Sequence, residues 1–106
     1  MARAIVTVPA TARRDEIIEI KAIAAHAMET GFRHTQLGVP IPRDIITGFV
    51  CTYNGEEIFR AVFYPAIAAN PYLAFSTLAI ASGTIACKWT GDNGYSVTES
   101  AAIAVD

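Results

Sequence analysis

The sequence has few charged residues and few of the signals that mark an enzyme or a nucleic-acid-binding protein. Only 17% of the 106 residues are charged, against a usual fraction of about 25%. The basic residues form no run, which argues against a phosphate-neutralising surface for nucleic acid. No nucleophile elbow, glycine-rich phosphate loop or carboxylate pair in a pocket-like context is present, so we expect no catalysis. Because the hydrophobic fraction is 53%, we expect a partner to cover part of the apolar surface.

Long apolar runs are also absent. No stretch approaches the roughly 20 residues of a membrane span. Residues 1–9 contain one arginine but no apolar core of roughly 7–15 residues, so they do not read as a secretory signal. From the residues alone we expect a cytoplasmic protein that makes no membrane contact.

Cysteine is scarce, and the two thiols, Cys51 and Cys87, have neither zinc nor thioredoxin spacing. Together with His26 and His34 they are the candidate metal ligands, but no two of the four have ligand spacing. We therefore expect no metal and no cofactor. Both cysteines lie on apolar faces of predicted strands, which favours buried free thiols. A Cys51–Cys87 disulfide is the alternative, if the two strands are neighbours and both side chains point inward.

The strongest structural signal is a β-hairpin centred on Asn54-Gly55. Asn and Gly tolerate the positive φ that both positions of a two-residue hairpin turn require. The flanking runs, from Ile45 to Tyr64, are rich in Ile, Val, Phe and Tyr, which suit a pleated, half-buried surface. On the first strand, one face carries Phe49, Cys51 and Tyr53.

Other short segments predict further strands at residues 4–8, 72–80, 84–90 and 95–105. The segment Glu16–Ala27 fits two structures: its alanine run and Asp15 favour a capped helix, whereas alternation of apolar and polar residues favours a strand. Taken as a strand, it completes about seven short strands separated by turns. This spacing predicts an all-β, immunoglobulin-like antiparallel β-sandwich, a single domain over residues 1–106. We expect its core to contain Ile18, Ile20, Ile85, Trp89, Val97 and Ile103.

One loop, His26–Arg33, brings together an imidazole, the Glu29 carboxylate and the Arg33 guanidinium. Loops on rigid sandwiches often carry binding residues, so one interpretation is a loop that contacts a partner. The other is a self-contained turn, in which Gly31 supplies a positive φ and Glu29 pairs with Arg33.

Two loop blocks, His26-Ala-Met-Glu-Thr-Gly-Phe-Arg33 and Pro40-Ile-Pro-Arg43, resemble the SoxZ family of the bacterial sulfur-oxidising (Sox) system. The similarity covers essentially the whole chain. It departs from the family at Ala27, where proline often follows the histidine. The other similar blocks are Phe49-Val-Cys-Thr-Tyr-Asn-Gly55, Pro65-Ala-Ile-Ala-Ala-Asn-Pro-Tyr72, Ser82-Gly-Thr84 and Trp89-Thr-Gly-Asp-Asn-Gly94.

The resemblance implies a non-catalytic subunit of the SoxYZ carrier complex. In that complex SoxY carries sulfur intermediates of thiosulfate oxidation on a glycine-flanked cysteine near its carboxyl end, and partner enzymes load, oxidise and hydrolyse the adduct. Cys51 and Cys87 are internal and lack adjacent glycines, so the chain resembles the Z subunit. The resemblance also implies a strand at Glu16–Ala27, and export to the periplasm bound to a signal-bearing SoxY in place of a cytoplasmic location.

With the resemblance included, we expect the loop His26–Arg33 and the turn Ala66–Pro71 to lie near SoxY or near the Sox enzymes that visit it transiently. Glu29 and Arg33 would act through charge-assisted hydrogen bonds, and Met28 through adaptable apolar contact. The alternative function is a small metal- or thiol-dependent redox enzyme on an immunoglobulin-like sandwich. The residues expected at the partner surface are His26, Met28, Glu29, Gly31, Arg33, Arg43, Asn70 and Pro71.

Overall fold

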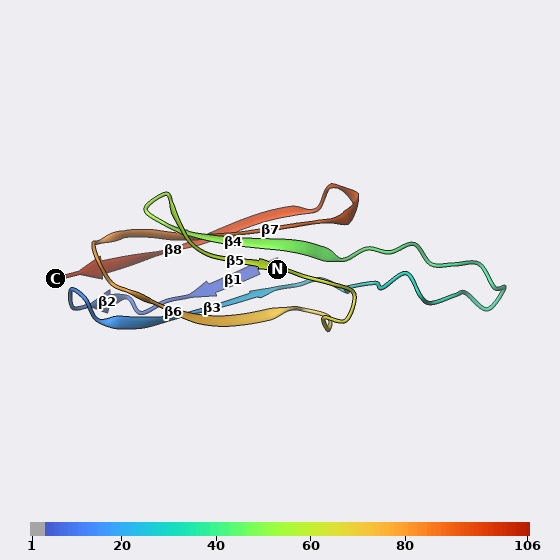
Figure 1. Cartoon of the computed structure of the whole chain (residues 1–106), viewed down its shortest axis with the longest axis horizontal. Coiled ribbons are helices and arrows are strands. Elements are labelled where there is room, and N and C mark those ends of the chain that lie inside the picture. The colour runs from blue at the N-terminus through green and yellow to red at the C-terminus, as the bar shows by residue number, and fades with distance from the viewer. Residues whose placement is uncertain (1–3) are drawn as a thin grey trace.

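The computed structural model describes residues 4–106, which form two β-sheets packed face to face (Figure 1). The all-β sandwich predicted from the strand spacing is confirmed. One sheet has the strand order β1-β3-β6, with β1 at Ala4–Thr7, β3 at Ile17–Ala24 and β6 at Tyr72–Leu78. The other has the order β2-β8-β7-β4-β5, with β2 at Thr11–Ala12, β4 at Ile46–Tyr53, β5 at Glu56–Val62, β7 at Gly83–Gly91 and β8 at Ser96–Val105.

The sequence did not predict β2, and β2 makes the sandwich not purely antiparallel. This two-residue strand pairs in parallel with the end of β8, in the register Thr11 with Ala104 and Ala12 with Val105. The chain thus passes from the three-stranded sheet to the five-stranded sheet between β1 and β2. Two residues are too few to show a hydrophobic period, so only the tertiary pairing reveals this strand.

The ambiguous segment Glu16–Ala27 is a strand, as the resemblance implied. Its alternate residues are buried along β3, the period of two expected for a half-buried strand. β3 is also the central strand of its sheet, antiparallel to both β1 and β6. No helix among the described residues is long and apolar enough to cross a membrane.

The turn at Asn54-Gly55 has the predicted conformation, with φ of 50° at Asn54 and 86° at Gly55. The Asn54 side chain also binds the chain where β7 begins. Its Oδ1 accepts the Thr84 N–H at 2.9 Å, and its Nδ2 donates to the Ser82 carbonyl at 3.3 Å. This residue therefore fixes one end of the sandwich as well as the hairpin.

Aromatic rings fill the space between the sheets. Phe49 and Trp89 lie with ring centroids 5.1 Å apart, and Phe59 of β5 stacks on Phe75 of β6 at 4.3 Å. The Trp89 indole is 0% exposed, and its N–H has no hydrogen-bond partner among the described residues. All six residues predicted for the core are buried: Ile18, Ile20, Ile85, Trp89, Val97 and Ile103.

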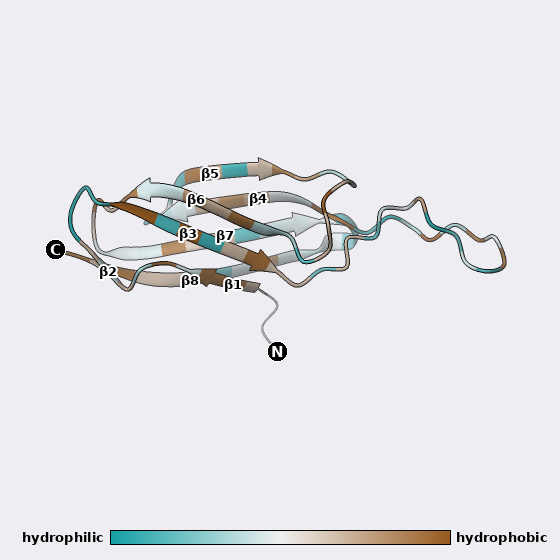
Figure 2. Cartoon of the chain, turned by 90° about the horizontal axis from the view of Figure 1, so that it is seen from below, coloured by the Kyte–Doolittle hydropathy of each residue, from teal (hydrophilic) through white to brown (hydrophobic). Residues whose placement is uncertain are grey.

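Between β3 and β4 the chain leaves the sandwich and returns as a long, irregular hairpin (Figures 1 and 2). We call residues 29–44 the projecting hairpin and the remaining described residues the body. Its two sides are joined by isolated bridges between Glu29 and Asp44 and between His34 and Pro40. In both views it extends away from one end of the body.

Candidate partner-binding site

Most of the residues predicted for partner contact meet where the projecting hairpin joins the body. The backbone of His26 is paired with Asn70 in the loop before β6. The His26 N–H donates to Asn70 Oδ1 at 2.9 Å, and the Asn70 N–H donates to the His26 carbonyl at 2.7 Å. These two bonds fix the loop His26–Arg33 against the turn Ala66–Pro71, so the two predicted regions are neighbours.

The His26 imidazole is held by three neighbours. Its Nδ1 accepts the Met28 N–H at 2.9 Å, so the proton of a neutral ring is on Nε2. That nitrogen lies 3.6 Å from Asp44 Oδ1. The ring meets Tyr95 edge to face, with centroids 4.8 Å apart. Since the side chain is only 8% exposed, His26 orients the hairpin base and offers no open surface to a partner.

Two predicted contact residues, Met28 and Pro71, are buried in this structure. Met28 was expected to supply surface apolar contact, but it packs in the core, and its Sδ accepts the Ile46 N–H at 3.2 Å. Its φ is 54°, an uncommon conformation for a residue other than Gly or Asn. Surrounding contacts must hold such a residue in place, and the buried side chain supplies them.

A second joint connects the hairpin to the turn between β7 and β8. Arg43 donates from Nε to Asp92 Oδ2 at 2.9 Å and from Nη2 to Oδ1 at 3.0 Å. Asp92 Oδ2 also accepts the Ile45 N–H at 3.1 Å. The Arg43 hydrogen bonds, with help from Ile45, lower the pKa of the Asp92 carboxyl. The bidentate pair therefore fixes the returning side of the hairpin to the body.

Gly31 is required at its position for two reasons. Its φ is 87°, and a Cβ built there would lie 2.9 Å from the Arg43 Cβ. The prediction that Gly31 supplies a positive φ is confirmed. The close approach to Arg43, which the sequence did not predict, brings the two sides of the hairpin together.

Glu29 and Arg33 form the ion pair that the self-contained interpretation requires. Arg33 Nε lies 3.1 Å from both Glu29 carboxylate oxygens, and Nη2 also bonds to Oε1. This hydrogen bonding lowers the pKa of Glu29 and raises the pKa of Arg33. The Glu29 side chain is 17% exposed and that of Arg33 is 70% exposed, so the guanidinium also presents a surface to solvent.

Three residues of the site were missed by the sequence analysis: Asp44, Asp92 and Tyr95. Asp92 lies between the strands predicted at residues 84–90 and 95–105, and Tyr95 begins the second of them. Neither position indicated contact with a loop nearly half the chain away. Only the return of Arg43 and Asp44 to the body brings these groups together. The three join a site whose predicted members all lie at the hairpin base or on the hairpin itself.

The two cysteines face each other across β4 and β7, with their Sγ atoms 3.6 Å apart. They are free thiols and 0% exposed, as the preferred interpretation expected. Because the Asn54 N–H donates to the carbonyl of its opposite residue, Thr84, the alternation of an antiparallel ladder makes Cys51 and Cys87 a closer, non-hydrogen-bonded pair. The hydrogen bond to Cys51, together with burial, raises the pKa of the Cys87 thiol, which keeps it protonated.

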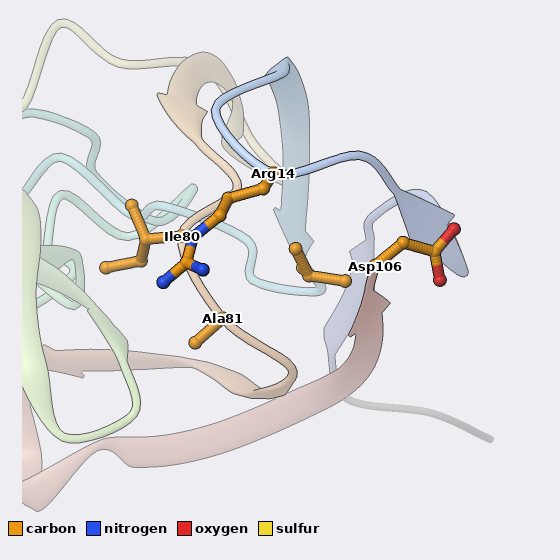
Figure 3. A pocket seen from close by; sticks show the side chains of 5 residues that line it. Arg14, Ile80, Ala81 and Asp106 are labelled. Atoms are coloured by element: carbon orange, nitrogen blue, oxygen red, sulfur yellow. The ribbon is translucent and has the colours of Figure 1, made fainter.

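Other chemistry is sparse in the described part of the chain. No group of three His, Cys, Asp or Glu residues in 4–106 could hold a metal ion. A hollow of about 160 Å³ at the other end of the body is lined by Arg14, Ile80, Ala81, Val105 and Asp106 (Figure 3). Small-molecule sites usually measure about 300–1,000 Å³. In Figure 3 the Asp106 carboxylate points away from Arg14, so the charged groups do not converge.

Comparison with known families decides the identity of the chain. The family model described as "Sulphur oxidation protein SoxZ" matches residues 5–102. The chain belongs to the SoxZ family. It is therefore a subunit of the Sox sulfur-carrier complex, as the loop motifs indicated. No curated protein matches the sequence.

Solved structures share the SoxZ fold at low sequence identity. A superoxide reductase (neelaredoxin) from Ignicoccus hospitalis gives a TM-score of 0.75 at 14% identity, over 97% of this chain and 79% of the other. A putative superoxide reductase from Thermotoga maritima gives 0.73 at 16%, over 97% and 85%. The sulfur carrier protein SoxY from Chlorobium limicola f thiosulfatophilum gives 0.72 at 6%, over 100% and 81%. At these identities the likeness concerns the fold.

Proposed function

We propose that this SoxZ-family chain is a non-catalytic subunit that forms a heterodimer with a SoxY-type sulfur carrier. The observation that carries the proposal is the SoxZ match over residues 5–102, together with the placement of both thiols. A covalent carrier needs a thiol that partner enzymes can reach. Cys51 and Cys87 are both 0% exposed between two sheets, so the sulfur adduct belongs on the SoxY cysteine.

The alternative, a small metal- or thiol-dependent redox enzyme, has the shared fold of the superoxide reductases in its favour. Its requirements are specific, however. A metal enzyme needs several ligands around one point, and His26 already uses Nδ1 to accept the Met28 N–H. A thiol enzyme needs a reachable thiolate, whereas Cys51 and Cys87 are both 0% exposed. We therefore place the chemistry on the partner.

The heterodimer is tested by mixing the purified chain with a SoxY-type subunit and measuring the mass of the complex by light scattering. We expect a stable one-to-one complex. Obligate interfaces of this kind often exceed about 2,000 Å² in total, so the complex should survive gel filtration. Two separate peaks at micromolar concentration would contradict the proposal.

Intact-mass analysis tests which subunit carries the sulfur adduct. After incubation with thiosulfate and the oxidising Sox enzyme, we expect added sulfur mass on the SoxY-type subunit and none on this chain. An adduct mapped to Cys51 or Cys87 would make the chain a carrier itself. Stoichiometric iron or zinc in the purified protein, measured by elemental analysis, would favour the redox-enzyme alternative.

We also propose that the complex works in the periplasm, with this chain exported in association with SoxY, and that other Sox enzymes contact the complex transiently. The support is the family's partnership with SoxY. Cell fractionation checks the location: the chain should reach the periplasmic fraction when a signal-bearing SoxY is expressed with it. Recovery in the cytoplasm alone under those conditions would contradict the proposal.

A further inference from the structure

The projecting hairpin gives the chain far more extent than a compact domain of its length. The radius of gyration is 16.3 Å and the principal extents are 60 × 24 × 18 Å. A compact chain of this length has a radius of gyration of about 13 Å. The body is an ordinary sandwich, and both views show the hairpin reaching beyond it along the long axis (Figures 1 and 2).

The accessible surface is correspondingly large. It measures 6561 Å², whereas a compact monomer of the same mass exposes about 5,700 Å². The excess is similar to the share of about 800 Å² that each partner contributes to a standard protein interface. The surface that the chain exposes beyond a compact monomer is therefore about the area that one partner buries in an ordinary interface.

The far part of the hairpin carries three large apolar side chains that are exposed among polar neighbours. Phe32 is 77% exposed, Leu37 is 91% exposed and Val39 is 56% exposed. We call these three residues the tip. An isolated exposed leucine needs no explanation, but three large apolar side chains on one projecting hairpin have no body surface to pack against. Several exposed apolar groups on one short segment are typical of protein contact sites.

The backbone beneath the tip is fixed. The Thr35 N–H donates to the Val39 carbonyl at 2.8 Å, and the Gly38 N–H donates to the Thr35 carbonyl at 2.9 Å. The Val39 N–H reaches Thr35 Oγ1 at 3.2 Å, and the Ile41 N–H reaches the Arg33 carbonyl at 2.9 Å. A turn closed in this way presents its side chains in a defined arrangement.

The base of the hairpin is fixed as well, by the Arg43–Asp92 pair and the His26–Asn70 backbone bonds. Ordering a flexible loop on binding costs free energy, and a segment ordered in advance avoids much of that cost. The hairpin thus has the two properties of a binding anchor: an exposed apolar end and a fixed direction.

Charge on the hairpin is low. Between residues 30 and 43 the only titratable side chains are Arg33, His34 and Arg43, and both arginines are already paired with carboxylates. Recognition at the tip is therefore apolar rather than electrostatic. Its contribution to affinity should depend little on salt, unlike contacts between exposed charges.

We infer that Phe32, Leu37 and Val39 insert into an apolar hollow on the SoxY-type partner, so that the projecting hairpin anchors the heterodimer. This inference rests on the proposed function. A second copy of this chain is a poorer occupant, because the hollow at the opposite end of its body, although partly apolar, measures only about 160 Å³, a small volume for three large side chains. Docking of a tip into the far end of a copy would also build an open-ended chain of subunits rather than a closed pair.

The test compares a tip variant with a matched body variant. The tip variant carries Phe32→Ser and Leu37→Ser. The control carries Ile17→Ser and Leu78→Ser, two exposed apolar residues paired across β3 and β6, with exposures of 72% and 47%. Affinity for the purified SoxY-type subunit is measured by titration calorimetry at low and high salt, and folding of each variant is checked by its melting curve.

We expect the tip variant to bind at least about 30-fold more weakly, the effect of losing one interface hot spot, at both salt concentrations. The control should bind like the unmodified chain. Equal binding by both variants, or equal weakening of both, would overturn the inference while the proposed function stands. Failure of the unmodified chain to bind SoxY would refute the proposed function and the inference with it.

A further outcome would reassign the tip. If the unmodified chain self-associates, and the tip substitutions abolish that association without changing SoxY binding, the tip docks on a second copy. Sedimentation of each variant without SoxY distinguishes this case, and it too would overturn the inference.

Discussion

The body and the projecting hairpin of this SoxZ-family protein are held in place by different interactions. The body is stabilised by buried apolar side chains, with Phe49, Trp89 and Ile20 all 0% exposed. From residue 30 to residue 43 of the hairpin, no residue is buried. There the structure depends on backbone hydrogen bonds, two ion pairs and the positive φ of two glycines, Gly31 and Gly38.

The difference teaches where stability and binding reside. Burial of apolar surface supplies most of the folding free energy, so the body should tolerate changes on the hairpin. The hairpin gains little from burial and is free to carry apolar groups that a partner covers. Segments with few buried contacts also open at lower free energy than the core. Substitutions in the body and in the hairpin should therefore change stability by different amounts.

The largest effect is expected in the body. Trp89→Ala leaves a cavity between the sheets and should cost roughly 3–5 kcal/mol of unfolding free energy, measured by urea denaturation. Trp89→Phe is the matched control, because it keeps a ring against Phe49 and removes the indole N–H that has no partner among the described residues. Equal losses in the two variants would show that ring packing is not what matters at this position.

Where the two sides of the hairpin come together, Gly31→Ala should lower the free energy of unfolding. We expect a smaller decrease than for Trp89→Ala and a larger one than for Gly38→Ala. Both glycines have positive φ, 87° and 81°, which costs an alanine roughly 1–2 kcal/mol. Only Gly31 has the Arg43 backbone and Cβ within contact distance of the new Cβ, which adds roughly 1–3 kcal/mol of overpacking. Equal urea midpoints for the two variants would contradict the close approach.

The second joint should depend on pH. The pKa of Asp92 is lowered in the folded state by Arg43 and Ile45, so its stabilising contribution is complete above the unfolded value of about 3.9. That contribution is lost as the pH falls from there through the folded pKa. In Arg43→Gln, the Asp92 titration followed by carboxyl NMR should move up towards its ordinary range. An unchanged midpoint would show that Arg43 is not the cause.

The smallest effect on stability is expected for Glu29→Ala combined with Arg33→Ala, since exposed ion pairs contribute little. The melting temperature should stay within a few degrees of the unmodified value. The control pair, Glu57→Ala with Arg60→Ala, removes a similar exposed ion pair from β5 of the body. We expect only the hairpin variant to bind SoxY more weakly, and normal binding and sulfur-compound oxidation by that variant would make Glu29 and Arg33 purely structural.

Much of the body could be predicted because its signals are local. Alternation along β3 and β7, and the positive φ that Asn54-Gly55 tolerates, depend on neighbouring residues alone. The inward faces were therefore assigned correctly for Ile18, Trp89 and Ile103. The strand β2 was missed because a two-residue pairing has no local pattern.

The sequence predicted which loops form the candidate site but not where each side chain lies. From its motifs we expected His26, Met28 and Pro71 at the surface. In the structure the His26 side chain packs against Asp44 and Tyr95, and Met28 and Pro71 are buried. The pairing of Arg43 with Asp92 joins residues 49 positions apart, and no local rule connects them. The sequence by itself determined the longer strands, the hairpin turn and the family, because periodicity and turn chemistry act between near neighbours. Which loop residues are exposed was decided only by the tertiary structure, because burial depends on segments that meet through long-range packing.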